Sequence, residues 1–220
     1  MLPNQNLPYA IGDFLSQGLA AMQLSVEERQ FEQLLGYISL LHKWRKTYNL
    51  TAIKDPMGLV SIHILDSLSI LPHLVGDRFI DVGSGAGLPG VPLAIMRPEN
   101  YFALLDSNGK KTRFLFQART QLKLTNTIEI NARAEEYSPK LKFDAVLTRA
   151  FSDLPTMLQN CHHLIKQNGL FLAMKGKWPQ RELDQMPDGY RLLSTDKLCI
   201  PGVEGERHLI KIKGMEVEDS

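Results

Sequence analysis

The sequence predicts an α/β protein in which a mostly parallel sheet follows a helical extension. Two observations support this. From about residue 77 to 175, near-continuous apolar stretches alternate with helical ones, as in parallel sheets covered on both faces. Residues 190–200 and 207–213 are extended and joined without a helix, which predicts a terminal antiparallel pair at the sheet edge. We therefore expect an extension at 1–76, a main domain at 77–214 and a tail at 215–220.

Helical periodicity dominates the extension. Ser25 and Glu28 match a capping box, with Ser25 as the N-cap. Apolar residues then recur at helical spacing: Phe31, Leu34, Leu35, Ile38, Leu41 and Trp44. A second helix is expected over residues 57–71, where Pro72 would end it.

Strands and helices are expected to alternate in the main domain. The expected strands are residues 78–82, 101–106, 127–130, 143–148 and 169–174. The expected helices between the later strands are residues 107–124 and 153–167.

The bulk composition limits the function classes. A net charge of +1 excludes a generic polyanion binder, so any nucleic-acid site must be a local cluster of basic residues. The two cysteines, Cys161 and Cys199, form no metal or redox motif, and we expect both to be small core residues of a reduced, cytoplasmic protein without a metal site. No long apolar run predicts a membrane span, and the first ten residues do not resemble a secretory signal.

The first expected strand runs into three glycines, at Gly83, Gly85 and Gly87. Glycine permits a sharp turn and lets a ligand approach the backbone closely. This turn lies beyond the carboxyl end of a strand, where open α/β sheets bind ligands. Asp106 ends the second strand, where a carboxylate can accept both ribose hydroxyls of an adenosine. The pattern predicts an adenosine-containing ligand.

Two adenosine cofactors fit this pattern. Residues 85–90 also satisfy Gly-x-Gly-x-x-Gly, and Asp106 would serve a nicotinamide dinucleotide equally well. S-adenosylmethionine is favoured because Asp81 precedes the first glycine and because the chain closes with an extended pair, as methyltransferase sheets often do. In addition, Pro89 and Pro92 occupy the helix start where a pyrophosphate needs free N–H groups. A tight turn without a ligand is the remaining alternative.

Residues 81–90, Asp-Val-Gly-Ser-Gly-Ala-Gly-Leu-Pro-Gly, resemble the signature of a bacterial family, the small-subunit rRNA guanine-N7 methyltransferases called RsmG or GidB. The Leu-Pro-Gly continuation is more specific than the glycines alone. Further blocks that resemble the family are residues 44–51, 63–68, 105–107, 113–115, 149–151 and 205–208. The likeness runs from about residue 30 to 213.

The resemblance implies a class I, Rossmann-like S-adenosylmethionine methyltransferase. It implies methyl transfer to N7 of a guanine in the 530 loop of 16S rRNA, at position 527 in the usual numbering. It also places the adenine at Ala134 and Glu135, and Arg149 at the donor or the target base. With the glycine pattern, the expected cofactor positions are Gly83, Gly85, Leu88, Asp106, Ala134, Glu135 and Arg149.

Guanine N7 carries a free lone pair, so in-line attack on the methyl group needs positioning and water exclusion but no obvious general base. Arg149 is the expected catalytic residue, because an arginine that closes a buried strand is costly without a partner. An ion pair with a neighbouring carboxylate is the alternative. Phe151 could stack on the target base or belong to the core.

Basic residues near aromatic ones are candidates for RNA contact: Lys46, Lys110, Arg113 and Lys175. Each could equally be part of a solvated face. Because the net charge is small, we expect the substrate to be a 30S particle or an assembly intermediate, and the protein to be a monomer.

Several residues of the matching blocks have no decided role. His63 and Asp66 share a helix face and serve either structure or substrate positioning, while the roles of Arg207 and His208 are open. The family often has an arginine where this chain has Ile62. Two other classes of function stay possible on the sequence alone, a nicotinamide-dependent oxidoreductase and a non-catalytic RNA-binding protein.

Overall fold

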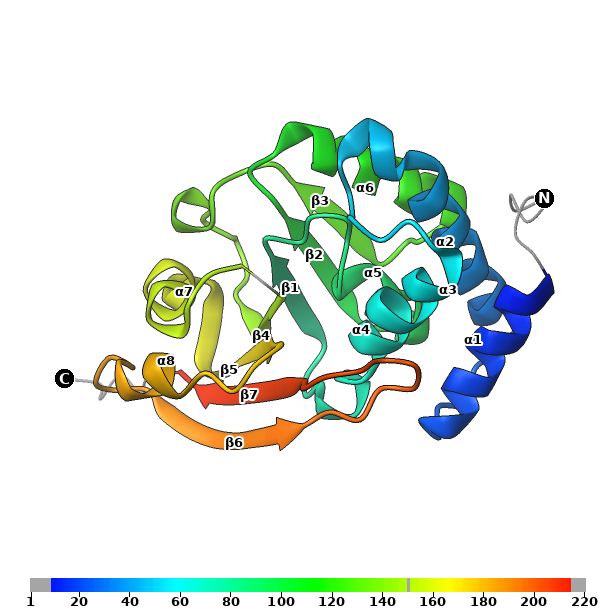
Figure 1. Ribbon diagram of the computed structural model, residues 1–220. Helices are drawn as coiled ribbons and strands as arrows, with labels where there is room; N and C mark the ends of the chain where they lie inside the picture. The colour runs from blue at the N-terminus through cyan, green and yellow to red at the C-terminus, as the bar shows by residue number, and fades with distance from the viewer. Residues whose placement is uncertain (1–8, 150, 215–220) are drawn as a thin grey trace.

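The computed structural model describes residues 9–149 and 151–214, so the tail expected at 215–220 lies outside the described residues. A seven-stranded sheet crosses the molecule, with helices on both faces (Figure 1). The strands are β1 (Arg78–Val82), β2 (Tyr101–Leu105), β3 (Thr127–Ile130), β4 (Phe143–Arg149), β5 (Ile165–Lys175), β6 (Arg191–Lys197) and β7 (His208–Lys213).

The strand order is β3-β2-β1-β4-β5-β7-β6. The first five strands along this order are parallel, and β7 runs antiparallel to both β5 and β6. The predicted mostly parallel sheet with a terminal antiparallel pair is confirmed. Its parallel strands end along one edge, and β7 begins at that same edge, because His208 pairs with Lys175 at the end of β5.

The α-helices are α1 (Tyr9–Ala21), α2 (Glu28–Tyr48), α3 (Pro56–Leu59), α4 (Asp66–Leu68), α5 (Gly90–Met96), α6 (Gly109–Leu122), α7 (Leu154–Cys161) and α8 (Gln180–Asp184). A π-helical turn, η1 (Val60–Leu65), joins α3 to α4. Short 3₁₀ turns are η2 (Leu71–His73), η3 (Ala134–Glu136) and η4 (His162–Leu164).

Three local expectations are wrong. The capping box of α2 is formed by Glu27 and Gln30 rather than by Ser25, since the Glu27 amide donates to Gln30 Oε1 at 2.9 Å. The helix expected to reach residue 167 ends at Cys161, because the chain pairs with β4 from Ile165 onward. Cys161 is buried as expected, but Cys199 is exposed in the connection after β6.

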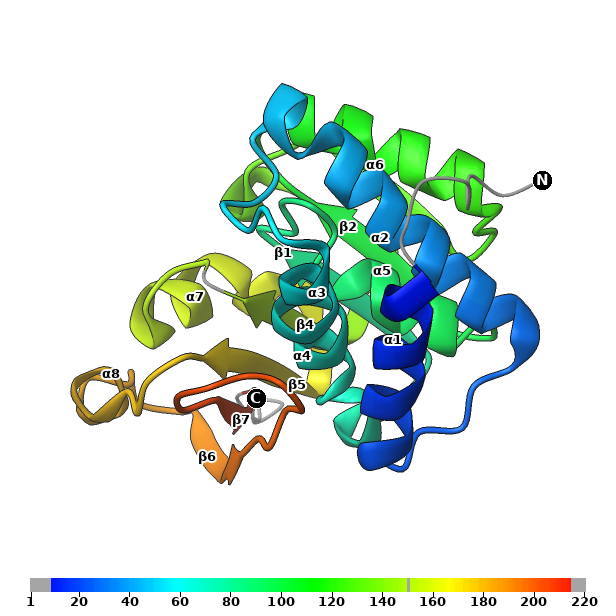
Figure 2. The same cartoon turned by 45° about the vertical axis from the view of Figure 1, so that its right-hand side comes forward.

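The helical extension packs onto the sheet. Helices α1, α2, α5 and α6 share one apolar core on one face, and α7 packs on the other face (Figure 2). Side chains of α2 form hydrogen bonds to the rest of the chain: Gln30 Nε2 donates to the Met96 carbonyl at 3.4 Å, Gln33 Nε2 donates to the Leu122 carbonyl at 2.7 Å, and the buried Tyr37 hydroxyl donates to the Ala86 carbonyl. The extension therefore touches the loop after β1 directly.

No helix among the described residues is long and apolar enough to cross a membrane. The same residues contain no group of three or more metal-binding side chains.

Candidate cofactor site

The loop after β1 approaches its neighbours through backbone alone. Gly83 has a φ of +69°, and a Cβ there would lie 2.6 Å from the ring of Phe151. Gly87 has a φ of +93°, and a Cβ there would meet Val91 at 2.6 Å and Leu115 at 2.8 Å. Since L side chains rarely adopt these angles and no space is left for them, the glycines are required by the shape of the loop.

Asp81, near the end of β1, is hydrogen-bonded to the loop that follows β1. Its Oδ2 accepts from the Ser84 hydroxyl at 2.7 Å and from the Gly90 amide at 2.9 Å, so one carboxylate joins the loop to the start of α5. The side chain is fully buried, and this burial raises the pKa of Asp81 to about 6. Asp81 Oδ2 therefore serves the loop, while its Oδ1 has no hydrogen-bond partner among the described residues.

Asp106, which follows β2, fixes the loop from the side. Its Oδ2 accepts from the Gly85 amide at 2.8 Å, and its Oδ1 accepts from the Asn108 amide at 2.8 Å. Lys111 Nζ lies 3.9 Å from Oδ2. Backbone amides and a lysine thus hold this carboxylate at the carboxyl end of the sheet, where it borders open space.

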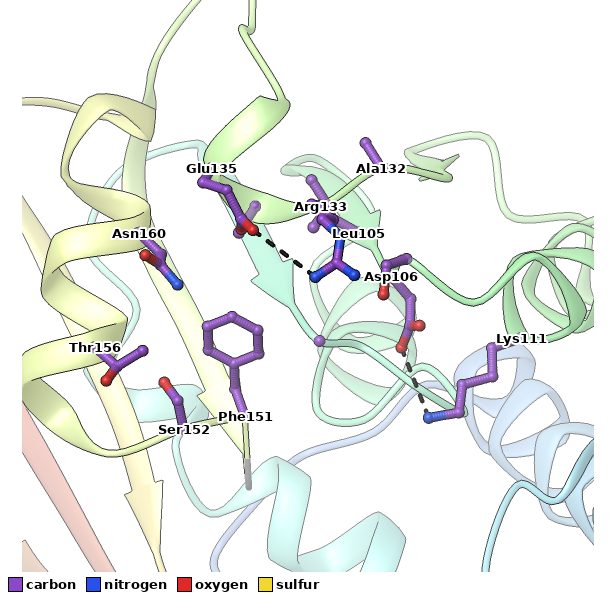
Figure 3. A pocket seen from close by; sticks show the side chains of 13 residues that line it. Leu105, Asp106, Lys111, Ala132, Arg133, Glu135, Phe151, Ser152, Thr156 and Asn160 are labelled. Atoms are coloured by element: carbon purple, nitrogen blue, oxygen red, sulfur yellow. Dashed lines mark ion pairs between the residues drawn. The ribbon is translucent and has the colours of Figure 1, made fainter.

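A cavity of about 380 Å³ opens beside Asp106. Figure 3 shows its side chains. They come from the ends of β1 and β2 and the segments after them, from α6, from the segments after β3 and β4, and from α7. The lining residues are Gly83, Leu105, Asp106, Ser107, Lys111, Ala132, Arg133, Ala134, Glu135, Phe151, Ser152, Thr156 and Asn160. A small ligand with a flat polar part and several hydroxyl groups fits a space of this size and polarity.

The cavity brings together four of the expected cofactor positions, Gly83, Asp106, Ala134 and Glu135. Three others do not line it. Gly85 binds Asp106 through its amide, Leu88 is buried in the core beneath the loop, and Arg149 points elsewhere. Thr156 and Asn160 on α7 were not foreseen, although their i, i+4 spacing on one helix face was a signal that could have found them.

Arg149 ends β4, next to the end of β1, but its side chain lies on the opposite face of the sheet from α7. The preceding residue, Thr148, points to α7, where its hydroxyl lies 3.3 Å from Met157 Sδ. Side chains alternate along a strand, so Arg149 points to the helical extension. There its Nη1 donates to the Ile62 carbonyl at 3.0 Å and to Asp66 Oδ2 at 2.9 Å. The ion pair considered as the alternative for Arg149 is therefore present.

His63 completes these contacts. Its Nδ1 lies 3.3 Å from Arg149 Nη2, and its Nε2 lies 2.6 Å from Thr51 Oγ1. Burial first, and then the Arg149 charge, lower the pKa of His63 to about 4. The imidazole is therefore neutral at pH 7, and it accepts from Arg149 and donates to Thr51.

The expected RNA contacts fall into two groups. Three of them are exposed: Lys46 near the end of α2, and Lys110 and Arg113 at the start of α6. The two helices are packed together there, since the Tyr48 and Phe114 ring centroids lie 6.1 Å apart. Lys175, by contrast, donates to the Ser152 carbonyl at 2.8 Å and pairs with Glu182 at 2.7 Å. Lys175 thus already serves the segment that borders the cavity.

Solved structures similar to this chain include methyltransferases. N-methyltransferase NodS from Bradyrhizobium japonicum, in complex with S-adenosyl-L-homocysteine, matches with a TM-score of 0.57 at 12% identity, covering 79% of this chain and 98% of that one. TYW2 from M. jannaschii, in complex with AdoMet, matches with a TM-score of 0.51 at 18% identity, covering 69% and 76%. The fold is that of the class I S-adenosylmethionine-dependent methyltransferases.

The family model described as rRNA small subunit methyltransferase G (GidB) matches residues 30–210. Proteins named ribosomal RNA small subunit methyltransferase G match as well. That of Erwinia tasmaniensis is 50% identical over 90% of this chain and 97% of its own length, and that of Vibrio vulnificus is 52% identical over 85% and 89%. The chain belongs to the rRNA small subunit methyltransferase G family, and the resemblance seen in the sequence is confirmed.

Proposed function

We propose that this protein transfers the methyl group of S-adenosylmethionine to N7 of a guanine in the 530 loop of 16S rRNA. The observation that carries this proposal is the cavity between the glycine loop and Asp106, in a chain of the rRNA small subunit methyltransferase G family. The family favours methyl transfer over the nicotinamide-dependent alternative. It also favours an enzyme over a non-catalytic RNA-binding protein.

The cavity residues fit the adenosine part of the cofactor. Asp106 borders the cavity with a carboxylate that can accept ribose hydroxyls, and Ala134 and Glu135 lie where the adenine would be held. Gly83, at the end of β1, lines the same cavity, so the rest of the molecule would lie next to the glycine loop. The reactive end would then lie on the side of Arg149, beyond Phe151.

S-adenosylmethionine supplies a methyl group on a sulfonium, and the guanine N7 lone pair forms the new N–C bond as the C–S bond breaks. No proton leaves N7, so the protein needs to hold the two reactants in line and exclude water. Asp81, a buried carboxylate next to the loop, binds Ser84 and Gly90 through its Oδ2 and so has a structural role in the loop. Arg149 is the group we expect to orient the donor or the base.

The exposed basic residues Lys46, Lys110 and Arg113 are the proposed RNA contacts. Lys175 contributes indirectly, because it holds the segment after β4 in place through the Ser152 carbonyl. With a net charge of +1, the protein gains little from long-range attraction to naked RNA. We therefore propose a 30S particle or an assembly intermediate as the substrate, and a cytoplasmic monomer as the active form.

Deleting the gene and mapping N7-methylguanine in 16S rRNA by chemical cleavage tests the proposal. We expect one cleavage site to disappear and to return when the wild-type gene is restored. An unchanged cleavage pattern would refute the assigned substrate. Calorimetry with the purified protein tests the cofactor separately, since S-adenosylhomocysteine should bind and NAD should not.

A further inference from the structure

The Arg149 guanidinium is held on one side and open on the other. Its Nη1 contacts Ile62 and Asp66, and its Nη2 contacts His63. Within residues 9–149 and 151–214, no partner is found for its Nε–H or for the second N–H of Nη2. The side chain is 21% exposed, so the open side can reach a ligand. The contacts of Nη1 and Nη2 therefore set the direction in which the unpartnered N–H groups point.

Asp66 is the charged group on the held side, and it binds two arginines at once. Its Oδ2 lies 2.9 Å from Arg149 Nη1, and its Oδ1 lies 3.3 Å from Arg207 Nε. The Asp66 side chain is 5% exposed, whereas that of Arg207 is 27% exposed. Oδ2 is hydrogen-bonded to Arg149, whereas Oδ1 forms an ion pair with Arg207 and has no hydrogen-bond partner among the described residues.

The π-helical turn explains why Ile62 and Asp66 reach the same guanidinium. The Asp66 amide would donate to the Ile62 carbonyl in an α-helix, but here it donates to the carbonyls of Ser61 and His63. The Ile62 carbonyl instead accepts from Arg149 at 3.0 Å. This contact uses backbone, so it does not depend on the side chain that replaces the arginine frequent in the family.

We propose that Asp66, which also forms an ion pair with Arg207 through its second oxygen, is a positioning residue that aims Arg149 at the reacting groups. This rests on the proposed function, in which Arg149 orients the donor or the target base. The two arginines share the Asp66 carboxylate, His63 is neutral at pH 7, and the buried Asp81 also interacts with the Arg149 charge. The unpartnered N–H groups of Arg149 are then donors for an acceptor group of the cofactor or the RNA.

A double-mutant cycle tests whether Asp66 acts through Arg149. We compare wild type, Asp66→Asn, Arg149→Ala and the double variant, using S-adenosylmethionine and 30S particles from the deletion strain. Asp66→Asn should lower kcat about 10-fold while the KM for cofactor changes little. In the Arg149→Ala background the same change should cause no further loss of kcat, because nothing is left to position. Equal losses in both backgrounds would overturn the proposal.

Asp144→Asn is the matched control for lost structure. Asp144 accepts from the amides of Asp77 and Arg78 at 2.9 Å and pairs with Lys166 at 2.6 Å, at the opposite end of the sheet from the site. The control should lower the thermal midpoint without lowering kcat at a temperature where it is folded. If Arg149→Ala itself keeps full activity, the role of Arg149 in the proposed function fails. If only Asp66→Asn keeps full activity, the positioning role fails.

Arg207→Gln keeps the test decisive if Asp66→Asn does not fold. Arg207 is partly exposed, and its removal leaves Asp66 paired with Arg149. The freed oxygen lets the carboxylate rotate, so kcat should fall by about 3-fold and should show no further loss in the Arg149→Ala background. An unchanged kcat in a folded Arg207→Gln protein would overturn the role given to Arg207 and the proposal with it.

Discussion

The two halves of the site are held in place by different kinds of interaction. On the α7 side, the cavity is framed by backbone: Gly83 approaches Phe151 without a side chain, and Asp106 is fixed by the amides of Gly85 and Asn108. On the side of the helical extension, Arg149 is held by charges, through Asp66 and then Arg207.

This difference separates two tasks. A loop held by amides and close packing has a single shape, and such a shape suits the recognition of a common cofactor. The Arg149 guanidinium is instead held by side chains, the Asp66 carboxylate and the His63 imidazole, so its orientation depends on residues from another segment of the chain. We therefore expect changes in the cavity to act on cofactor affinity, and changes around Arg149 to act on the rate of transfer.

The largest expected effect is that of Arg149→Ala. Loss of the group that orients the reactants should lower kcat about 100-fold, whereas Asp66 keeps Arg207 as a partner and limits the loss of stability. Single-turnover methylation of 30S particles measures the rate, and thermal unfolding measures the stability. Parallel losses of stability and activity would contradict the catalytic role. An equal loss of cofactor affinity would show that the two halves are not separate.

A smaller effect is expected for Asp106→Ala. The Kd for S-adenosylhomocysteine should rise about 10-fold, because charge-assisted hydrogen bonds to a carboxylate are lost, while kcat at saturating cofactor stays close to that of wild type. Isothermal titration calorimetry measures the Kd. Asp196→Ala is a matched control, since Asp196 pairs with Lys211 at 3.2 Å on the terminal strands. A fall in kcat with unchanged affinity would reverse the tasks given to the two halves.

The smallest expected effect is a pH dependence of stability that comes from His63, one of the residues that hold Arg149. The folded pKa of His63 is lowered to about 4 from the ordinary value of 6.5. Between these values the unfolded chain binds a proton that the folded chain does not, so stability contributed by neutral His63 is lost as the pH falls from about 6.5 to about 4. Urea denaturation at several pH values should give a shallower decline for His63→Gln than for wild type. Parallel declines would count against this assignment.

The sequence predicted the residues of the cavity better than the contacts that hold Arg149, and the reason is physical. The glycine loop is a contiguous motif at a strand end, and Asp106 ends the next strand, so a local pattern locates both. The pair of Asp66 with Arg149 joins positions 83 residues apart, and Arg207 comes from still further along the chain. No local periodicity encodes such contacts. Spacing gave only that His63 and Asp66 share a helix face.

Apolar runs in the sequence predicted most strands of the sheet, but they missed the first residues of β5, which were expected to be helical. Its first residues after Ile165 are exposed and polar, and Asn168 has a φ of +63°, so this stretch resembles the end of a helix. Pairing with β4, across a register shift between Phe143 and Ala145, makes it a strand. Tertiary pairing outweighs local preference there.

The antiparallel direction of β7 also affects the order in which the parts of the site form during synthesis. Because β7 starts beside the end of β5, Arg207, the residue just before β7, lies close enough to form an ion pair with Asp66. Translation proceeds from the N-terminus, and the segments of a protein fold as they emerge. The residues that line the cavity all lie between positions 83 and 160, so Arg207 is translated after all of them. During synthesis the cavity can form first, and the ion pair of Asp66 with Arg207 forms only after residue 207 has emerged.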